Sequence, residues 1–137
     1  MEPNVVHRLT DEQVEQLFEL YESTYWADDR NLLEIRHMLD ETGVFVGVCD
    51  QKTDELVGFA RVLTDYVFRA FVEDVIVAET HRNEGFGRIL MDALFAHPDL
   101  QQAESITLGC REDVVSFYER WGFEVAPEEM QLMNVVR

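Results

Sequence analysis

Lysine is almost absent from this chain of 137 residues, since Lys52 stands alone and arginine supplies the rest of the 11 basic side chains. Against them stand 28 aspartates and glutamates, which gives a formal net charge of −17. So few cations argue against nucleic-acid binding, which requires basic patches to meet phosphates. An acid-rich, lysine-poor surface resembles that of halophile proteins, for which molar salt screens the repulsion between carboxylates. An acidic protein of an ordinary cytosol is the alternative.

Cysteine is scarce too, and neither Cys49 nor Cys110 has metal-ligand spacing. The four histidines form no ligand pair on one helix face, so the sequence predicts no metal site. No apolar run reaches about 18 residues, which argues against a membrane partner. The N-terminal residues MEPNVVHRL lack the basic and apolar regions of a secretory signal. We therefore expect a cytoplasmic protein whose thiols are packed rather than paired in a disulfide.

The most informative pattern spans residues 71–97. Apolar and β-branched residues over 71–77 predict a buried strand, and apolar residues at helical spacing over 89–95 predict an amphipathic helix. Between them, residues 82–87 read Arg-x-x-Gly-x-Gly. Glycines at such a junction let backbone N–H groups turn toward an anion. The first turn of the helix adds unpaired N–H donors and a positive dipole end, so the pattern predicts a pyrophosphate-binding loop.

Other phosphate loops fit this pattern poorly. A Walker loop requires Gly-Lys-Ser/Thr, which does not follow Gly87, and the spacing is wrong for a dinucleotide fold. The loop resembles the acetyl-CoA loop of the GNAT N-acetyltransferase superfamily, Gln/Arg-x-x-Gly-x-Gly/Ala. A second segment, Ser-Phe-Tyr-Glu-Arg-Trp-Gly-Phe at 116–123, resembles the family's Phe-Tyr-x-x-x-Gly-Phe segment at the usual distance downstream. The resemblance extends from about Val5 to the end of the chain.

This resemblance implies a fold of the α/β (α+β) class in which helices lie on both faces of a mixed, mostly antiparallel sheet. The length and the hydrophobic content of 47% suit one domain over residues 1–137. Thr10 with Gln13 predicts a capping box at the start of the first helix. The expected helices cover about 10–21, 30–39, 86–97 and 113–121, and the expected strands cover about 5–9, 44–49, 56–63, 71–77, 105–108 and a C-terminal hairpin of 124–126 with 130–136.

The resemblance further implies acetyl-CoA as co-substrate and acetyl transfer by direct attack of an amine, without an acyl-enzyme. The residues that it assigns to donor binding are Val75, Ile76 and Val77 for the pantetheine arm, and Arg82, Asn83, Glu84, Gly85, Phe86, Gly87 and Arg88 for the pyrophosphate. Many family members carry Asn seven residues before the tyrosine of the second segment. Arg111 stands there in this chain, so that contact is either lost or made by a longer cation.

Tyr118 is the predicted general acid, because a phenol with a pKa of about 10 can protonate a thiolate whose conjugate acid has a pKa of about 8.5. A packing role beside its aromatic neighbours is the alternative. The pair Glu73-Asp74 resembles the polyamine acetyltransferase branch, in which the acid orients or deprotonates the amine, often through water. Adjacent residues of a strand point to opposite faces, so we expect one acid on each side of the sheet. Glu73 is the predicted base if burial raises its pKa, and a structural acid otherwise.

The acceptor is expected between the first two helices and the strand after Tyr66. The predicted substrate-binding residues there are Tyr25, Trp26, Asp28 and Asp74, which favour a cationic amine through cation–π contact and charge pairing. Aromatic side chains at a helix junction also serve as core. The expected partner is a small-molecule amine, and a homodimer is a further expectation. A non-catalytic acyl-CoA-binding regulatory module is the alternative function, whereas a modifier of tRNA or ribosomes conflicts with the lack of a basic surface.

Overall fold

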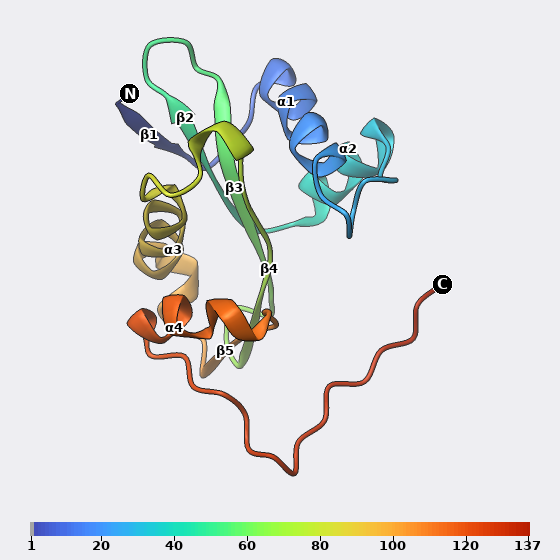
Figure 1. The fold of residues 1–137 in the computed structure, drawn as a ribbon, viewed down its shortest axis with the longest axis vertical. Coiled ribbons are helices and arrows are strands. Elements are labelled where there is room, and N and C mark those ends of the chain that lie inside the picture. Colours follow the sequence, from blue (N-terminus) through green and yellow to red (C-terminus); the bar gives the residue numbers. More distant parts are fainter. Residues whose placement is uncertain (1) are drawn as a thin grey trace.

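A five-stranded sheet with the order β1-β2-β3-β4-β5 organises the computed structural model, which describes residues 2–137. The strands are β1 (Pro3–Val6), β2 (Val44–Asp50), β3 (Leu56–Thr64), β4 (Arg69–Val77) and β5 (Ser105–Leu108). Each of the first four strands is antiparallel to its neighbour, and β5 is parallel to β4. The predicted mixed, mostly antiparallel sheet is therefore confirmed (Figure 1).

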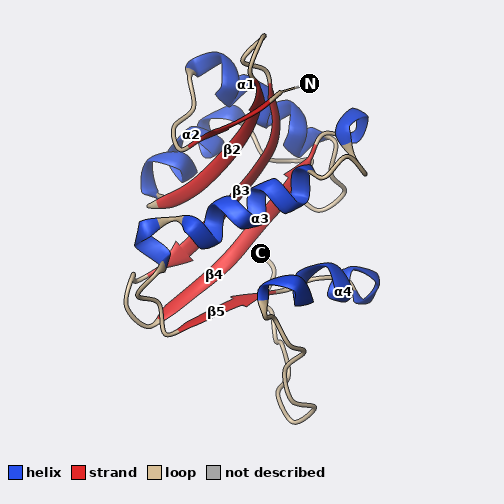
Figure 2. Ribbon diagram, turned by 90° about the vertical axis from the view of Figure 1, so that its left-hand side faces the viewer, coloured by secondary structure: helices blue, strands red, loops and turns tan. Residues whose placement is uncertain are grey.

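Helices cover both faces of this sheet, as Figure 2 shows. They are α1 (Asp11–Glu22), α2 (Leu32–Glu41), α3 (Phe86–Ala96) and the short α4 (Val115–Tyr118), with 3-10 turns at Glu79–His81, Pro98–Leu100, Glu112–Val114 and Glu119–Trp121. The predicted helix over 113–121 is thus divided into an α-helical turn between two 3-10 turns. The remaining expected helices are confirmed within a few residues.

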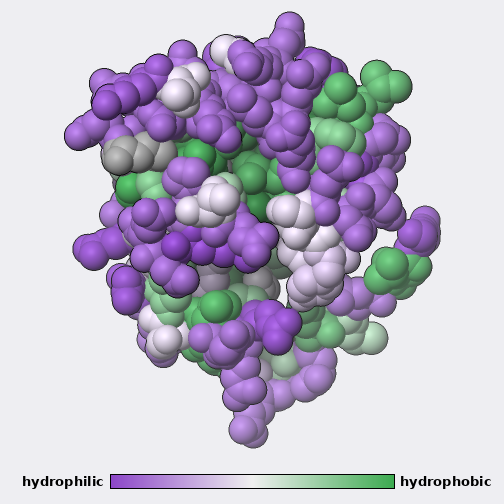
Figure 3. All heavy atoms as spheres, turned by 45° about the horizontal axis from the view of Figure 1, so that its top comes forward, coloured by the Kyte–Doolittle hydropathy of each residue, from purple (hydrophilic) through white to green (hydrophobic). Residues whose placement is uncertain are grey.

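Two hydrophobic clusters hold the layers together, one on each face of the sheet. On one face α1 and α2 bury Leu17, Tyr21 and Ile35 against Phe59 and other sheet residues. On the other face α3 packs its apolar stripe against the β-branched residues of β2 and β3. This follows from the alternation of side chains along each strand. The face drawn in Figure 3 is mostly hydrophilic, and hydrophobic side chains show between the polar ones.

Side chains cap the N-termini of α1 and α2. Thr10 and Gln13 form the predicted capping box, in which the Thr10 hydroxyl accepts from the Gln13 N–H at 3.1 Å and the Gln13 side chain accepts from the Thr10 N–H at 3.0 Å. Asn31 and Glu34 form the same motif at α2. Each box satisfies backbone donors that a helix start otherwise leaves unpaired.

Strand β4 departs from regular pairing at Asp74. Phe59 lies opposite Ile76, whereas Arg61 lies opposite Glu73, so one residue of β3 faces two of β4. Asp74 has a φ of +56° in this bulge. Directly opposed residues share a face, so Glu73 lies on the side of Arg61, whose guanidinium binds Asp74. The expectation that the two acids face opposite sides is therefore wrong, because the bulge interrupts the alternation.

The two ends of the chain differ from the expected strands. The first strand ends at Val6 instead of Leu9. Residues 124–137, all of which the structure describes, form no strand, so the predicted C-terminal hairpin is wrong. This segment runs away from the sheet in Figure 1, and its apolar side chains stay exposed, with Leu132 at 76% and Val136 at 90%. Alternation of apolar residues favours a strand, but a strand forms only where another edge pairs with it.

Candidate active site

Strands β4 and β5 separate beyond Val72, where their pairing ends opposite Leu108. A cavity of about 370 Å³ lies at this separation. It is lined by residues of β4, the end of β5 and the segment after it, the end of α4 and the α1–α2 connection, namely Tyr25, Trp26, Val72, Glu73, Asp74, Val75, Leu108, Gly109, Cys110, Arg111, Val114 and Tyr118. Polar side chains from distant parts of the sequence thus meet where the backbone of β4 is no longer paired with β5.

Glu73 is the carboxylate of this cavity whose proton affinity is increased. Burial raises the pKa of Glu73, and the neighbouring charge of Asp74 raises it further, whereas Arg61 and Arg30 act in the opposite direction. A carboxylate with a raised pKa is a stronger base than one in water. The side chain is therefore suited to accept a proton from a group in the cavity.

Asp74 has the opposite character. Its Oδ2 atom accepts hydrogen bonds from the Tyr21 hydroxyl at 2.8 Å, from Nη1 of Arg30 at 2.8 Å and from Nε of Arg61 at 2.7 Å. The side chain is only 4% exposed. Burial alone would raise the pKa of Asp74, but the two guanidinium hydrogen bonds outweigh it and hold the pKa below its ordinary value. Asp74 is therefore a paired anion and a poor base.

Tyr118 reaches the cavity from α4. Its ring packs edge-on against Phe117 and Phe123, with centroid distances of 5.0 and 6.1 Å. Burial raises the pKa of Tyr118, and the nearby Cys110 raises it further. The phenol therefore stays protonated at neutral pH and can donate a proton, while the same ring contributes to the packing of α4.

The Arg-x-x-Gly-x-Gly loop continues from the end of β4. Nε of Arg82 donates to the carbonyl oxygen of Val77 at 3.2 Å and so ties the loop to the strand. Gly85 has a φ of +88°, and a Cβ there would meet no atom within 4 Å, so its need for glycine is conformational. A Cβ at Gly87 would lie 3.2 Å from the ring of Phe117, so that glycine permits close packing instead.

The N-terminus of α3, which this loop precedes, is open. Within residues 2–137 no side chain caps it, whereas capping boxes close α1 and α2. Its unpaired N–H groups and positive dipole end are available to an anion. Arg82 and Arg88 are exposed beside it, and Arg88 forms only a long ion pair of 3.9 Å with Asp92. Backbone donors and two cations thus converge on one exposed turn.

Comparison with known proteins agrees with these features. The family model described as "Acetyltransferase (GNAT) family" matches residues 6–123, which is most of the chain. This chain belongs to the GNAT acetyltransferase family. The uncharacterized N-acetyltransferase ycf52 of Pyropia yezoensis is 32% identical over 122 residues, which cover 86% of this chain and 68% of the relative. The chain thus spans about two thirds of that relative's length.

Solved structures of GNAT proteins superpose on more than nine tenths of the chain. A GNAT-family protein of Xanthomonas campestris pv. campestris has a TM-score of 0.83 at 29% identity and covers 98% of this chain, with 94% of its own length aligned. An aminoglycoside 6′-N-acetyltransferase solved with coenzyme A has a TM-score of 0.75 at 20% identity over 93% of this chain and 87% of its own, a likeness of fold alone. The resemblance inferred from the two sequence motifs is confirmed, and so is the GNAT fold.

The structure brings the predicted acid, the predicted base and several other predicted GNAT site residues together around one cavity. Tyr25, Trp26 and Arg111 join Glu73 and Tyr118 around the cavity. Tyr25 and then Asp113 raise the pKa of the Arg111 guanidinium. Asp28 is exposed and does not line the cavity, so its place in the acceptor site stays a prediction. The α1–α2 connection turns that carboxylate outward.

Sequence reasoning missed the two arginines that bind Asp74. Arg61 is the single charged residue in the apolar run 56–63. A charge in a buried strand is usually paired, so this residue could have indicated a buried ion pair. Arg30 ends the aromatic and acidic segment of the α1–α2 connection and gave no comparable signal. Ile76 and Phe86, predicted on the donor side, have buried side chains, so any contact with a ligand there would be made by their backbone.

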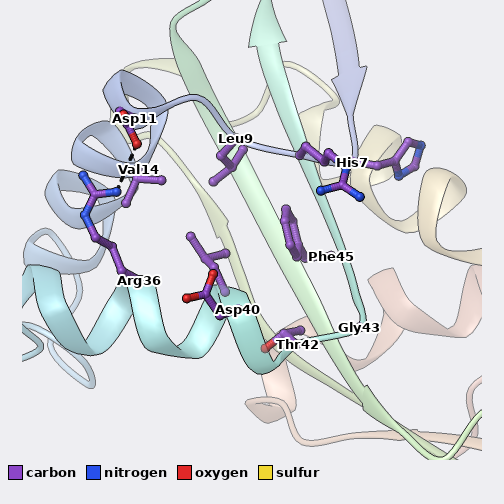
Figure 4. A pocket seen from close by; sticks show the side chains of 11 residues that line it. His7, Leu9, Asp11, Val14, Arg36, Asp40, Thr42, Gly43 and Phe45 are labelled. Carbon is purple, nitrogen blue, oxygen red and sulfur yellow. Dashed lines mark hydrogen bonds and ion pairs between the residues drawn. The ribbon is translucent and has the colours of Figure 1, made fainter.

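A larger hollow of about 650 Å³ lies elsewhere, between α1, α2 and the β1–β2 edge (Figure 4). In it, Arg36 pairs with Asp11 at 3.2 Å, and Asp40 and His7 lie around the opening. None of the predicted GNAT site residues lines this hollow.

Among residues 2–137 no cluster of three His, Cys, Asp or Glu side chains could hold a metal ion. No helix in the same range combines the length and hydropathy that crossing a membrane requires.

Proposed function

We propose that this GNAT protein is an acetyl-CoA-dependent N-acetyltransferase that transfers the acetyl group to a primary amine of a small molecule by direct attack. One observation carries the proposal, namely that Glu73 and Tyr118 line the same cavity at the separation of β4 and β5. Attack of an amine on a thioester needs a base for the ammonium and an acid for the thiolate. Family membership and the related fold that was solved with coenzyme A support the donor.

The donor side of the cleft has the properties that the cofactor requires. Acetyl-CoA supplies an activated thioester. The backbone of Val75, Ile76 and Val77 lies beyond the end of the β4–β5 pairing and would hold the pantetheine arm. The open N-terminus of α3 and the loop of residues 82–88 would hold the pyrophosphate through backbone N–H groups. Arg111 lines the cavity where the family's Asn contact is absent, and would provide a longer donor to the same arm.

The proposed acid and base reach the cavity from different elements, Tyr118 from α4 and Glu73 from β4. Glu73, with its raised pKa, would take the proton of the acceptor ammonium, directly or through water. Tyr118 would protonate the departing thiolate, since its raised pKa keeps the phenol protonated at neutral pH and so available as a proton donor. Asp74 would not compete for the proton, because hydrogen bonds from the two guanidiniums keep it ionised.

Thiol release from acetyl-CoA, measured with a panel of primary amines at low and high salt, tests this function. We expect amine-dependent release, and kcat/KM should rise with pH as Glu73 loses its proton, above the ordinary pKa of a glutamate. Glu73→Gln should lower kcat/KM about 10²–10⁴-fold and flatten that part of the profile. Glu79→Gln, at an exposed site just after β4, is the matched control. Coenzyme A binding without release by any amine would indicate the non-catalytic acyl-CoA-binding module instead.

The single domain over residues 1–137, the cytoplasmic location and the homodimer stay predictions.

A further inference from the structure

Asp74 binds two cations, one more than its single negative charge can neutralise. One carboxylate binds two guanidiniums, Arg30 and Arg61, through the same oxygen atom. The Tyr21 hydroxyl donates to that oxygen as well, which places three donors on it. Asp74 alone neutralises one of the two guanidiniums, and the second is balanced only while the neighbouring Glu73 is ionised. When Glu73 takes up a proton, the group carries an uncompensated cation at the edge of the cavity, which favours an anionic ligand.

Most hydrogen-bond donors of these arginines are unused. A guanidinium has N–H groups on Nε, Nη1 and Nη2, and Arg61 donates to Asp74 with Nε alone. Its side chain is 13% exposed, and no buried polar side-chain atom within residues 2–137 lacks a partner. The Nη groups of Arg61 must therefore reach a surface accessible to solvent. They form a forked donor held in place by Asp74, as bidentate recognition of a carboxylate or phosphate requires.

Both arginines line a cavity of about 260 Å³, together with Ile35, Met38 and Glu34. It adjoins the cleft of Glu73, because Asp74 lines that cleft and binds both arginines. Oε1 of Glu34 already accepts the Asn31 N–H at 3.1 Å in the cap of α2. The cavity thus combines two cations and the capping carboxylate of Glu34 with the apolar side chains of Ile35 and Met38, and it lies next to the predicted base.

The groups that favoured a cationic acceptor are occupied within the protein. The guanidinium of Arg30 lies 4.7 Å from the ring centroid of Tyr21 and 5.8 Å from that of Trp26. These aromatic faces therefore already hold a cation, and Asp74 already pairs with two. A second cation entering here would meet Arg30 and Arg61, so the arrangement disfavours polyamine-like acceptors.

We propose that Arg30 and Arg61 bind an anionic group, a carboxylate or a phosphate, of the acceptor, whose amine is thereby directed to Glu73. This inference rests on the proposed acetyltransferase function and names the substrate class as amines that carry an anion. Arg61 provides the forked donor, and Arg30, held by the aromatic rings, provides the second cation. Asp74 is a positioning residue, since it orients both guanidiniums.

The experiment compares kcat/KM for matched acceptors. These are a series of ω-amino acids of increasing length with their amides, O-phosphoethanolamine with ethanolamine, and 1,3-diaminopropane. We expect the best carboxylate or phosphate acceptor to exceed its neutral partner about 10- to 100-fold, the effect of one or two charge-assisted hydrogen bonds. The carboxylate and phosphate arms show which anion is bound. Equal rates for anionic and neutral partners, or a preference for the diamine, would overturn the inference and leave the acetyltransferase function intact.

Arg61→Gln separates recognition from packing. It should remove the preference for the anionic acceptor, so that kcat/KM falls much further for the anionic acceptor than for its neutral amide, and Arg61→Lys should restore part of the preference. Arg69→Gln is the control, since that arginine lies on β4 with its side chain 70% exposed. An equal loss for both acceptors would mean that Arg61 only supports the fold. If no amine is acetylated, calorimetry with the ω-amino acids in the presence of coenzyme A decides, and binding that Arg61→Gln leaves unchanged would overturn the inference.

Discussion

The two sides of the cleft use different parts of the polypeptide. On the proposed donor side, the loop of residues 82–88 and the start of α3 offer backbone N–H groups that no side chain caps. On the acceptor side, α1 and α2 begin with capping boxes, and the polar groups are side chains bound to one another around Asp74. The N-terminus of α3, where a phosphate is expected, therefore has no side-chain cap, whereas capping boxes satisfy the backbone donors of α1 and α2.

This difference predicts which changes matter on each side. A donor site made of backbone depends on glycine conformation and tolerates many side-chain changes. An acceptor site made of paired charges depends on individual side chains, and the loss of one leaves the others unpaired. The following variants test this contrast.

The largest effect is expected where the two sides meet. Tyr118→Phe keeps the packing ring but removes the proton donor, so turnover should fall about 10²–10⁴-fold while coenzyme A affinity changes little. Steady-state kinetics together with calorimetry measures the two quantities. Tyr66→Phe, a tyrosine that does not line the cavity, is the control. Turnover at the wild-type rate would make Tyr118 a packing residue only.

Asp74→Asn should produce the largest loss of stability on the acceptor side. Two guanidiniums lose their anion in a buried place, which costs about 3 kcal/mol, the lower end for a broken buried pair because Arg30 is one-third exposed. The lowered pKa of Asp74 means that the ionised carboxylate stabilises the fold above the ordinary aspartate pKa, and that this stability is lost as pH falls through the lower, folded-state pKa.

Urea unfolding of the Asp74→Asn variant and the wild type from neutral to acidic pH checks this prediction. The two free energies of unfolding should differ most near neutral pH and converge in acid. Asp11→Asn is the control, since Asp11 pairs with Arg36 at the surface and is 94% exposed. A difference that is constant over the whole pH range would exclude the ionised Asp74 as its source.

Gly85→Ala compared with Gly122→Ala tests the donor side. Both glycines have positive φ values, +88° and +90°, and a Cβ at either would meet no atom within 4 Å. Each variant should lose about 1–2 kcal/mol of stability, the cost of a left-handed conformation with a side chain. Only Gly85→Ala should also weaken coenzyme A binding, because it alters the loop before α3. Equal affinity in the two variants would remove the loop from the donor site.

Thr10→Ala removes the side-chain cap of α1, so that the N-terminus of α1 is uncapped like that of α3. The loss of the cap should cost about 1 kcal/mol of stability. Coenzyme A affinity should not change, since the donors exposed at α1 lie away from the cleft. Thermal melts and calorimetry measure these two effects. A change in coenzyme A affinity would contradict the separation of the two sides.

Salt should have the smallest specific effect on the donor side. Screening of the −17 charge should strengthen coenzyme A binding between about 0.05 and 0.5 M KCl, although it also weakens the contacts of Arg82 and Arg88. Weaker binding over that range would mean that the local arginines dominate. A melting temperature that rises up to about 3 M KCl would support a halophilic protein, and a plateau below about 0.3 M would indicate an ordinary acidic one.

Local patterns in the sequence predicted much of this protein. The strand–loop–helix of residues 71–97, the capping box at Thr10 and the strand at 105–108 depend on neighbours within a few positions, and the structure confirms them. The two motifs were also sufficient to recognise the GNAT family, which the match over residues 6–123 shows. Spacing along the chain determines these features, so composition and periodicity reveal them.

The ion pairs of the proposed acceptor side depend on the tertiary structure. Asp74 binds Arg30 and Arg61, which lie 44 and 13 positions away, so no local pattern joins them. The bulge that turns Asp74 toward them arises from pairing between β3 and β4 and reverses the alternation expected of a strand. Likewise, residues 130–136 carry a strand-like pattern but have no paired edge. The sequence alone predicted the loop of residues 82–88, because that motif depends on neighbouring residues. The partners of Asp74 followed only from the folded chain, because they lie far from it in the sequence.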